Sequence, residues 1–483
     1  MMIKLCAGLI IILIAFFIFN GCIQISPDEE KLNKGYEFYE KREYDKAFPL
    51  YKESAESGNK IAQRYLGFMY ARGEGVKRDD NEAVKWLSKA FKQSDIKSAY
   101  FIGLIYLNAG KTDENFKIAF DTFHYAATRN LPEAQFNLAI MYYRGNYVKR
   151  DYAKALEWYR KASENGDLSA KRNIASMYFR GEGVEKDWSK AFEFYKEVAE
   201  AGYAPAQYDL GLMFLKGYAV DKDEKKAFSW FQKAAEQGDT NGQRVVATMY
   251  YYGNGGVDRD LSKAFELFQL SATKGCSVSQ YGLATMYLNG KGTEKDEEKA
   301  YEWFKKSAEG GEANAQVFLA RSYAEGKPPF IEKDINKAIE LFQKAISKEY
   351  LPAYNELAYL WAEQGTNLQE AETLIIKAIE KESDNGSYLD TYGWVLYKQE
   401  KFHEALKQLE KALGINPNSS VIRDHLGDTY LKLEMKDKTK EQWQKALELK
   451  PEDKLKDKIT SKLVALEKAE TVPAPAPSKE PSK

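Results

Sequence analysis

Aromatic residues recur through the middle of the chain at an almost constant spacing. Successive positions lie 36 residues apart, except for one gap of 37 residues. The series comprises Tyr70, Tyr106, Tyr142, Tyr178, Phe214, Tyr250, Tyr287 and Tyr323. A period this regular is typical of stacked structural repeats, in which each unit contacts its neighbours along the chain.

A second pattern marks the start of a helix in every repeat. A side chain that can cap a helix precedes an alanine by four residues, and an apolar pair such as Trp158-Tyr159 follows that alanine, with Thr122 as the polar exception. The spacing predicts an amphipathic helix after each cap, with the alanine and the pair facing the core. The predicted caps are Asp79, Asn115, Asp151, Asp187, Asp223, Asp260, Asp296 and Asp334.

The segment before each cap predicts a partner helix. It carries an alanine, a leucine four residues later, a small residue and then the periodic aromatic, as at Ala206, Leu210, Gly211 and Phe214. The small residue lets two helix backbones approach. Glycine turns such as residues 73–76 and 181–184 supply the left-handed conformations that end this helix. The sequence therefore predicts an all-α fold, an α/α superhelical solenoid of helix-turn-helix repeats.

This pattern resembles the Sel1-like repeat, a relative of the tetratricopeptide repeat with a longer loop. The resemblance covers eight copies within residues 59–352. The copy at residues 102–132 departs most, because residues 111–114 replace its glycine turn, and residues 327–332 lengthen the last loop. Insertions in surface loops cost little stability, so we expect the repeats to continue through both places.

The ends of the chain are more similar to the tetratricopeptide repeat itself. The twelve residues from Gly393 to Ala405, and from Gly35 to Ala47, are shorter than the matching spacing in the middle. We predict tetratricopeptide-like repeats in residues 353–451 and a tether followed by one such hairpin in residues 22–58. Residues 452–470 have an apolar face and predict a capping helix, and the proline-rich residues 471–483 predict a disordered tail.

The N-terminus has the layout of a bacterial lipoprotein signal. Lys4 precedes an uncharged segment, residues 5–19, and Asn20-Gly21 then leads directly to Cys22. The resemblance implies that residues 1–21 are a removable signal peptide and that Cys22 is acylated and anchors the chain to a membrane. An uncleaved signal anchor is the alternative. Ile23, where an aspartate would favour retention in the inner membrane, implies an outer-membrane lipoprotein that faces the periplasm.

Composition and charge argue against several classes of function. The 71 lysines and arginines balance 72 aspartates and glutamates, so the chain lacks the basic character of a nucleic-acid-binding protein. The three histidines and three cysteines are too few and too scattered for a metal centre. We expect no metal, no cofactor and no nucleic-acid partner.

Ser-x-x-Lys motifs raise the possibility of a β-lactamase-like hydrolase. They occur at Ser57, Ser94 and Ser271, and residues 383–385 match a second element of that family. Such short motifs arise by chance in a lysine-rich chain, no Lys-Thr-Gly follows, and all three serines fall near turns between repeats. We predict that the chain is not an enzyme and keep an envelope hydrolase as a remote alternative.

Two further residues invite a catalytic interpretation. Cys276 has no histidine within a hundred residues, so a half-buried thiol explains it better than a nucleophile. His425 and Asp428 could share a helix face, but the last tetratricopeptide helix explains both.

Binding is expected on the concave face, which the first helix of each repeat lines in tetratricopeptide proteins. Tyr397 is an additional candidate anchor. Carried over by that resemblance, the groove-facing residues are Arg172, Ser176, Arg180, Tyr208, Leu212, Lys216, Asp390, Trp394, Lys398, Asp424, Asp428 and Lys432.

The same resemblance implies a protein–protein interaction scaffold. Lipoproteins that combine the two repeat types recruit or position envelope assemblies for export, secretion or outer-membrane assembly, so we expect one or more envelope proteins as partners. The 33 tyrosines and 8 tryptophans leave a second function open, a carbohydrate or peptidoglycan binding module, because aromatic rings stack on sugars.

Overall fold

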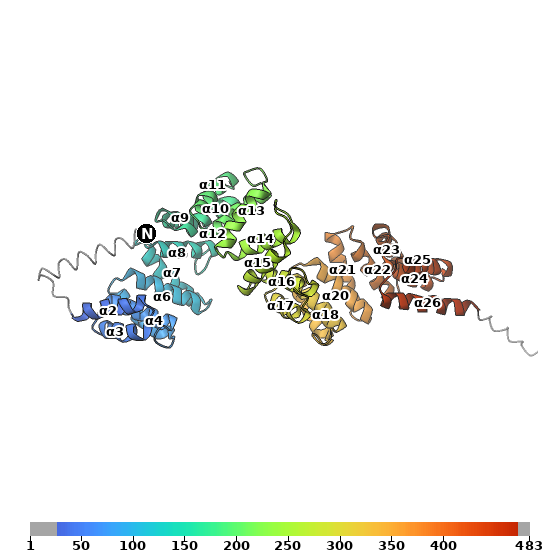
Figure 1. Ribbon diagram of the computed structural model, residues 1–483, viewed down its shortest axis with the longest axis horizontal. Coiled ribbons are helices and arrows are strands. Elements are labelled where there is room, and N and C mark those ends of the chain that lie inside the picture. The colour runs from blue at the N-terminus through green and yellow to red at the C-terminus, as the bar shows by residue number, and fades with distance from the viewer. Residues whose placement is uncertain (1–26, 472–483) are drawn as a thin grey trace, which may run out of the picture. The chain divides into compact units, whose positions relative to one another are not determined.

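The computed structural model describes residues 27–471 as a succession of α-helices joined by short turns (Figure 1). The chain divides into two compact units, residues 1–239 and 240–483. Antiparallel helix pairs follow one another in each unit, which confirms the predicted α/α solenoid of helix-turn-helix repeats. Cys22, the signal segment and the residues after 471 lie outside the described part of the chain. Within residues 27–471, no helix combines the length and the apolar character that a membrane span needs.

Twelve helices of the first unit form six hairpins among its described residues. We call the even-numbered helix of each hairpin the first helix and the odd-numbered one the second helix. The helices are α2 (Pro27–Glu40), α3 (Tyr44–Glu56), α4 (Lys60–Arg72), α5 (Asp80–Lys92), α6 (Ile96–Ala109), α7 (Asp113–Ala127), α8 (Pro132–Arg144), α9 (Tyr152–Glu164), α10 (Leu168–Arg180), α11 (Trp188–Glu200), α12 (Ala204–Lys216) and α13 (Glu224–Glu236).

The second unit continues the same pattern and ends in a helix without a partner. Its helices are α14 (Thr240–Tyr252), α15 (Leu261–Thr273), α16 (Ser277–Asn289), α17 (Glu297–Glu309), α18 (Ala313–Glu325), α19 (Ile335–Ile346), α20 (Leu351–Gln364), α21 (Leu368–Lys381), α22 (Gly386–Lys398), α23 (Phe402–Ile415), α24 (Ser420–Lys432), α25 (Lys436–Glu448) and α26 (Asp453–Thr471).

In seven repeats an aspartate forms hydrogen bonds with both helices of the hairpin. The Asp223 N–H donates to the Phe214 carbonyl at the end of α12 across 2.9 Å, and the Asp223 carboxylate accepts from the Lys226 N–H in the first turn of α13. The predicted caps are confirmed at these positions. The same two kinds of bond are made by Asp79, Asp151, Asp187, Asp260, Asp296 and Asp334.

The prediction that Asn115 caps its helix was wrong. Thr112 is the cap, since its hydroxyl accepts from the Asn115 N–H at 3.2 Å, and α7 therefore begins at Asp113. The Asn115 side chain donates to the Gly110 carbonyl instead. This repeat lacks the glycine turn, so the chain enters its second helix earlier than in the other repeats.

Alanines and large apolar side chains fill the core between paired helices. Gly211 of α12 lies so close to α13 that a Cβ atom there would meet the Phe231 ring at 2.6 Å. A Cβ at Gly427 of α24 would lie 2.3 Å from the Trp443 ring. This close approach explains why the first helix carries a small residue at this position and the second helix an aromatic one.

Buried glutamines, which the sequence analysis did not identify, join successive hairpins. Gln207 of α12 donates to the Ala199 carbonyl of α11 at 3.2 Å and accepts from the Gln237 side chain at the end of α13 at 2.8 Å. Its amide thus connects three helices in the core. The bond to the carbonyl eight residues earlier recurs at Gln63, Gln135, Gln280 and Gln316.

The capping aspartates predict a specific response to acid. Backbone N–H groups of the second helix hold the pKa of four of these carboxyls below its ordinary value, so the ionised form stabilises the fold. This contribution is present above the unfolded pKa, about 3.9, and is lost as the pH falls through the lower folded value. The four are Asp187, Asp223, Asp260 and Asp296.

Replacing these four aspartates by asparagine keeps the capping acceptor and removes the titration. We expect the variant to lose less melting temperature than the wild type between about pH 5 and about pH 2. Equal losses in thermal melts over this range would contradict the assignment. Four exposed aspartates that cap no helix serve as the control when changed to asparagine: Asp121, Asp221, Asp258 and Asp384.

Replacing Gln207 by leucine tests the buried glutamine. The substitution leaves the Ala199 carbonyl and the Gln237 amide without their partner, so we expect a loss of about 1–3 kcal/mol in the free energy of unfolding, measured in urea. The exposed Gln232, which bonds only to Glu236 on the same helix in the described structure, provides the control as Gln232→Leu. Equal stability of the two variants would show that the hydrogen bonds of the buried Gln207 do not stabilise the fold.

Candidate functional site

The predicted binding residues of the first unit lie on neighbouring first helices, α10 and α12. Arg172 of α10 donates from Nε to Oδ2 of Asp209 on α12 at 2.5 Å. Burial raises the pKa of Asp209, and Arg172 opposes that shift. Arg172 therefore joins two repeats rather than standing in open solvent.

The other predicted residues of this unit differ in accessibility. Arg180 is exposed and donates to the Tyr143 hydroxyl of α8 at 3.2 Å. Lys216 is exposed, whereas Ser176 and Leu212 are half-buried. The ring of Tyr208 lies 5.5 Å from that of Phe231, so it takes part in the packing of α12 on α13.

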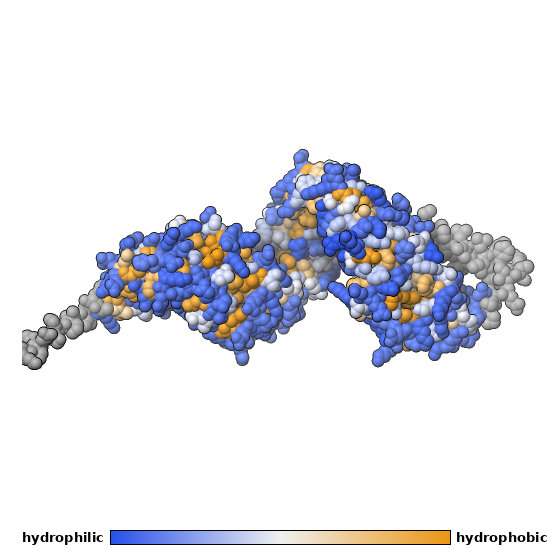
Figure 2. Space-filling view, turned by 180° about the vertical axis from the view of Figure 1, so that it is seen from behind, coloured by the Kyte–Doolittle hydropathy of each residue, from blue (hydrophilic) through white to orange (hydrophobic). Residues whose placement is uncertain are grey.

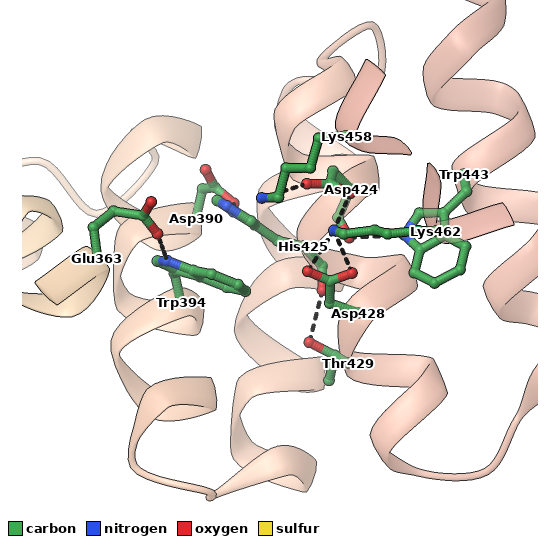
Figure 3. A network of polar contacts seen from close by, with 10 residues as sticks. All are labelled: Glu363, Asp390, Trp394, Asp424, His425, Asp428, Thr429, Trp443, Lys458 and Lys462. Atoms are coloured by element: carbon green, nitrogen blue, oxygen red, sulfur yellow. Dashed lines mark hydrogen bonds and ion pairs between the residues drawn. The ribbon is translucent and has the colours of Figure 1, made fainter. Parts of the chain in front are cut away.

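In the second unit, the predicted residues of α22 and α24 come together in one polar cluster (Figure 3). Trp394 of α22 is only 4% exposed. Its ring stacks on those of Tyr397, 4.7 Å away, and His425, 4.1 Å away, and its Nε1–H donates to Glu363 of α20 at 2.7 Å. Burial raises the pKa of Tyr397 to about 12, with Asp428 and Asp424 adding to the effect.

His425 pairs with Asp390 rather than with Asp428. Its Nδ1 lies 2.8 Å from Oδ1 of Asp390, and both side chains are buried between α22 and α24. Asp428 and Asp424 instead contact Lys462 of α26. His425 and Asp428, which the sequence places on one helix, therefore take part in two separate contacts, His425 with Asp390 and Asp428 with Lys462.

The lysines of this surface lie at its edge. Lys398 is half-buried with its ammonium 4.9 Å from the centre of the Trp394 ring, and Lys432 is exposed. The structure thus uses Asp390, Trp394, Asp424 and Asp428 in contacts within the chain, and a binding role for the predicted residues stays a prediction.

The enzyme-like motifs occupy structural positions. Ser57 ends α3, and Ser94 lies in the turn after α5. Ser271 is completely buried near the end of α15, where its Oγ lies 2.8 Å from Oγ of Ser279. Asn385 caps α22. A buried serine in this position cannot meet a substrate from solvent.

Cys276 is the half-buried residue that precedes α16, as expected for a structural thiol. In the region covered by residues 27–471, no three histidine, cysteine, aspartate or glutamate side chains gather in a way that could hold a metal ion.

Lysines cover the tryptophans of the second helices. The ammonium of Lys89 lies 3.8 Å from the centre of the Trp86 ring, and Lys233 lies 3.9 Å from that of Trp230. Lys161 with Trp158 and Lys306 with Trp303 repeat this geometry. These ring faces are therefore already occupied, which does not favour stacking on a sugar.

Two open cavities lie among the helices, one beside a periodic aromatic of the first unit and one in the second unit. One of about 630 Å³ is lined by Tyr178, Lys190 and Phe194, and one of about 520 Å³ lies over Trp361 and Leu374. On the side drawn in Figure 2, apolar side chains form separate patches between hydrophilic ones. Such patches suit apolar side chains of a protein partner.

An aromatic cluster at the turn edge of the first unit was missed by the sequence analysis. Trp188 begins α11 and is 37% exposed, yet its ring lies 4.8 Å from that of Tyr218 and 6.2 Å from that of Phe179. Other repeats carry varied residues at this position: Asp80, Tyr152, Glu224, Leu261, Glu297 and Ile335. Because the position follows no pattern along the chain, the sequence alone does not single out Trp188.

Comparison with known families identifies the repeats. The Sel1 repeat model matches residues 32–59, 60–95, 132–167, 168–203, 204–239, 241–276, 277–312 and 313–350, which together exceed half of the chain. It matches the first hairpin, for which the sequence predicts a tetratricopeptide-like repeat, and does not match residues 96–131, where the capping residue differs.

A solved structure has the same fold over most of the chain. It is c5321, a protective antigen of uropathogenic Escherichia coli strains with an SLR fold, which is 28% identical, has a TM-score of 0.54, and aligns over 90% of this chain and 99% of its own.

Curated relatives match shorter segments. The Arabidopsis thaliana ERAD-associated E3 ubiquitin-protein ligase component HRD3B is 34% identical over 23% of this chain and 17% of its own length. The exopolysaccharide production negative regulator of Rhizobium leguminosarum is 30% identical over 27% of this chain and 54% of its own length. The chain thus spans only part of each of these relatives. With the Sel1 model matched over more than half of its residues, the chain belongs to the Sel1 repeat family.

Proposed function

We propose that this chain is a protein-binding scaffold held at the bacterial envelope by lipid on Cys22, where it recruits or positions an envelope assembly. Sel1 repeats generally mediate protein–protein interactions. Export, secretion and outer-membrane complexes are the classes of assembly that a scaffold facing the periplasm would serve.

The aromatic cluster around Trp188 is the observation that carries the protein-binding part of this proposal. Tryptophan is enriched among residues that dominate binding energy, and a ring held in place by neighbours loses little conformational entropy on binding. Trp188 meets both conditions, because Tyr218 and Phe179 order it while more than a third of its surface stays open.

Two observations support the envelope location. The N-terminal sequence has the layout of a lipoprotein signal that ends at Cys22. The E. coli relative is described as a protective antigen, and an envelope location is compatible with that role. Neither observation selects a particular assembly.

The carbohydrate-binding alternative has weaker support than the protein scaffold. It needs aromatic faces open to a sugar, whereas lysines lie over the tryptophan rings of α5, α9, α11, α13 and α17, Lys186 over Trp188 among them, and Trp394 is buried in a stack. The name of the Rhizobium relative refers to regulation of exopolysaccharide production, and a protein scaffold is compatible with such a role.

Affinity purification from cross-linked, detergent-solubilised envelopes tests the proposed function. We expect the tagged wild type to retain one or a few envelope proteins in constant ratio, Cys22→Ala to lose them, and Trp188→Ala to retain about tenfold less or lower still. Glu185→Ala, at an exposed position of the preceding loop, is the control and should behave as the wild type. Mass spectrometry of the retained material provides the measurement.

Two outcomes would count against the proposal. Retention of glycan-linked material without a stoichiometric protein would support the carbohydrate-binding alternative. Partners captured equally by the wild type and by Trp188→Ala would show that the turn-edge cluster is not the contact surface.

A further inference from the structure

Helix α24, the first helix of the final hairpin, carries two buried carboxylates. Asp424 and Asp428 lie one turn apart on α24, and the Asp424 side chain is 1% exposed. Burial raises the pKa of Asp428, and the neighbouring Asp424 adds to this shift. Buried charges of like sign on one helix face need positive partners.

The chain's own C-terminal helix supplies those partners (Figure 3). The ammonium of Lys462 lies 2.6 Å from Oδ1 of Asp424 and 2.5 Å from Oδ1 of Asp428, and that of Lys458 lies 3.1 Å from Oδ2 of Asp424. Burial disfavours the charge on Lys458, but Asp424 outweighs this effect and raises the pKa of Lys458. Two ammonium groups thus balance two carboxylates.

The rest of α26 is held by a narrow apolar stripe. Among its side chains that the structure describes, only Ile459 and Leu466 are buried, and they pack on Trp443 of α25. Leu455 and Leu463 are half-buried beside them. A small apolar contact and a charged contact together therefore hold this helix against α24 and α25.

Helix α26 contacts α24 at nearly the sequence separation at which α24 contacts α22. His425 of α24 reaches Asp390 of α22 across 35 residues, and Lys462 of α26 reaches Asp428 of α24 across 34 residues. The residues of both contacts lie in the one network that Figure 3 shows. The end of the stack therefore accepts a helix through repeat-like contacts.

We propose that this α24 face is a docking site for a lysine-bearing amphipathic helix of a partner protein, and that α26 occupies it as an intramolecular ligand. This inference rests on the proposed protein-binding function and names the chemistry of the partner. A matching helix carries lysines at positions i and i+4 and apolar residues at i+1, i+5 and i+8, as Lys458, Lys462, Ile459, Leu463 and Leu466 do in α26.

The buried charges favour a docking site over a simple cap. A helix that only shields the end of a solenoid needs an apolar inner face and a polar outer face. Buried ion pairs are a weak source of stability, because desolvation offsets most of their attraction, but they discriminate strongly against a partner that lacks the complementary charge. Asp424 and Asp428 therefore favour a helix with lysines at these positions over a helix without them.

A labelled peptide of residues 453–471 tests the proposal on the full-length chain. In the wild type, α26 competes for the site, so the peptide should bind weakly. Replacing Lys458 and Lys462 by alanine weakens the internal ligand, and we expect the peptide to bind this variant about tenfold tighter or more, measured by fluorescence anisotropy. Adding Asp424→Asn and Asp428→Asn to the same variant should abolish that gain.

Matched controls separate the site from general charge effects. Lys454→Ala with Lys456→Ala removes the same charge from exposed positions of α26 and should leave peptide affinity at the wild-type level. A peptide with glutamate at both key lysines should not bind. Binding of that peptide as tight as binding of the native one would overturn the proposal, as would the absence of any gain in a Lys458→Ala, Lys462→Ala protein whose circular dichroism matches the wild type.

Hydrogen exchange on the unmodified chain gives a second test that needs no substitution. We expect the amides of α26 to exchange faster than those of α24, and faster still when excess peptide displaces the helix. Exchange of α26 that is unchanged by the peptide would contradict displacement. Failure here would leave the proposed scaffold intact, because capture of envelope proteins depends on Cys22 and Trp188, which this experiment does not involve.

Discussion

In seven repeats, a single aspartate sets the geometry of the helix hairpin from which the stack is built. Its N–H is bonded to the carbonyl of the periodic aromatic on the first helix, and its carboxylate caps the second helix, so the two helices meet at a fixed point. The loop between them varies. Asp223 follows Phe214 by nine residues, Asp260 follows Tyr250 by ten, and Asp334 follows Tyr323 by eleven, yet the N–H to carbonyl distance is 2.9 Å each time. Extra residues are therefore accommodated in the loop without altering the hairpin.

The contacts within each hairpin recur along the chain, and this explains what the sequence could predict. The period of the aromatics and the capping aspartates depend on interactions within one repeat, so they recur and identify the helices directly. Prediction succeeded at Asp223 for that reason and failed at Asn115, where the shortened turn of one repeat gives Thr112 the capping role. The buried glutamines also recur, but a polar residue in a helix pattern is ordinarily assigned to the surface.

The candidate site was harder to predict because its contacts join residues of different repeats. Asp390 and Asp424 occupy equivalent first-helix positions, yet the first meets a histidine of α24 and the second meets lysines of α26. Position within the repeat places such side chains on the first-helix face. The position within the repeat does not determine whether the next helix carries a residue that neutralises the aspartate, because the residue that would do so does not recur from repeat to repeat. Trp188 was missed for a related reason, because the residue after the capping aspartate varies from repeat to repeat and nothing in the sequence singles out this one.

The stacked hairpins restrict where a partner can bind. First helices of neighbouring repeats are bonded to each other where Arg172 meets Asp209 and Arg321 meets Glu356, and a partner helix could enter there only by separating two repeats. The turn edges and the second helices stay accessible along the whole array, but they offer side chains rather than an open helix-packing position. The end of the stack differs, because α26 is attached there on one side only and carries few buried apolar residues. A helix can be exchanged at that end at the cost of one interface, whereas exchange between two repeats costs two.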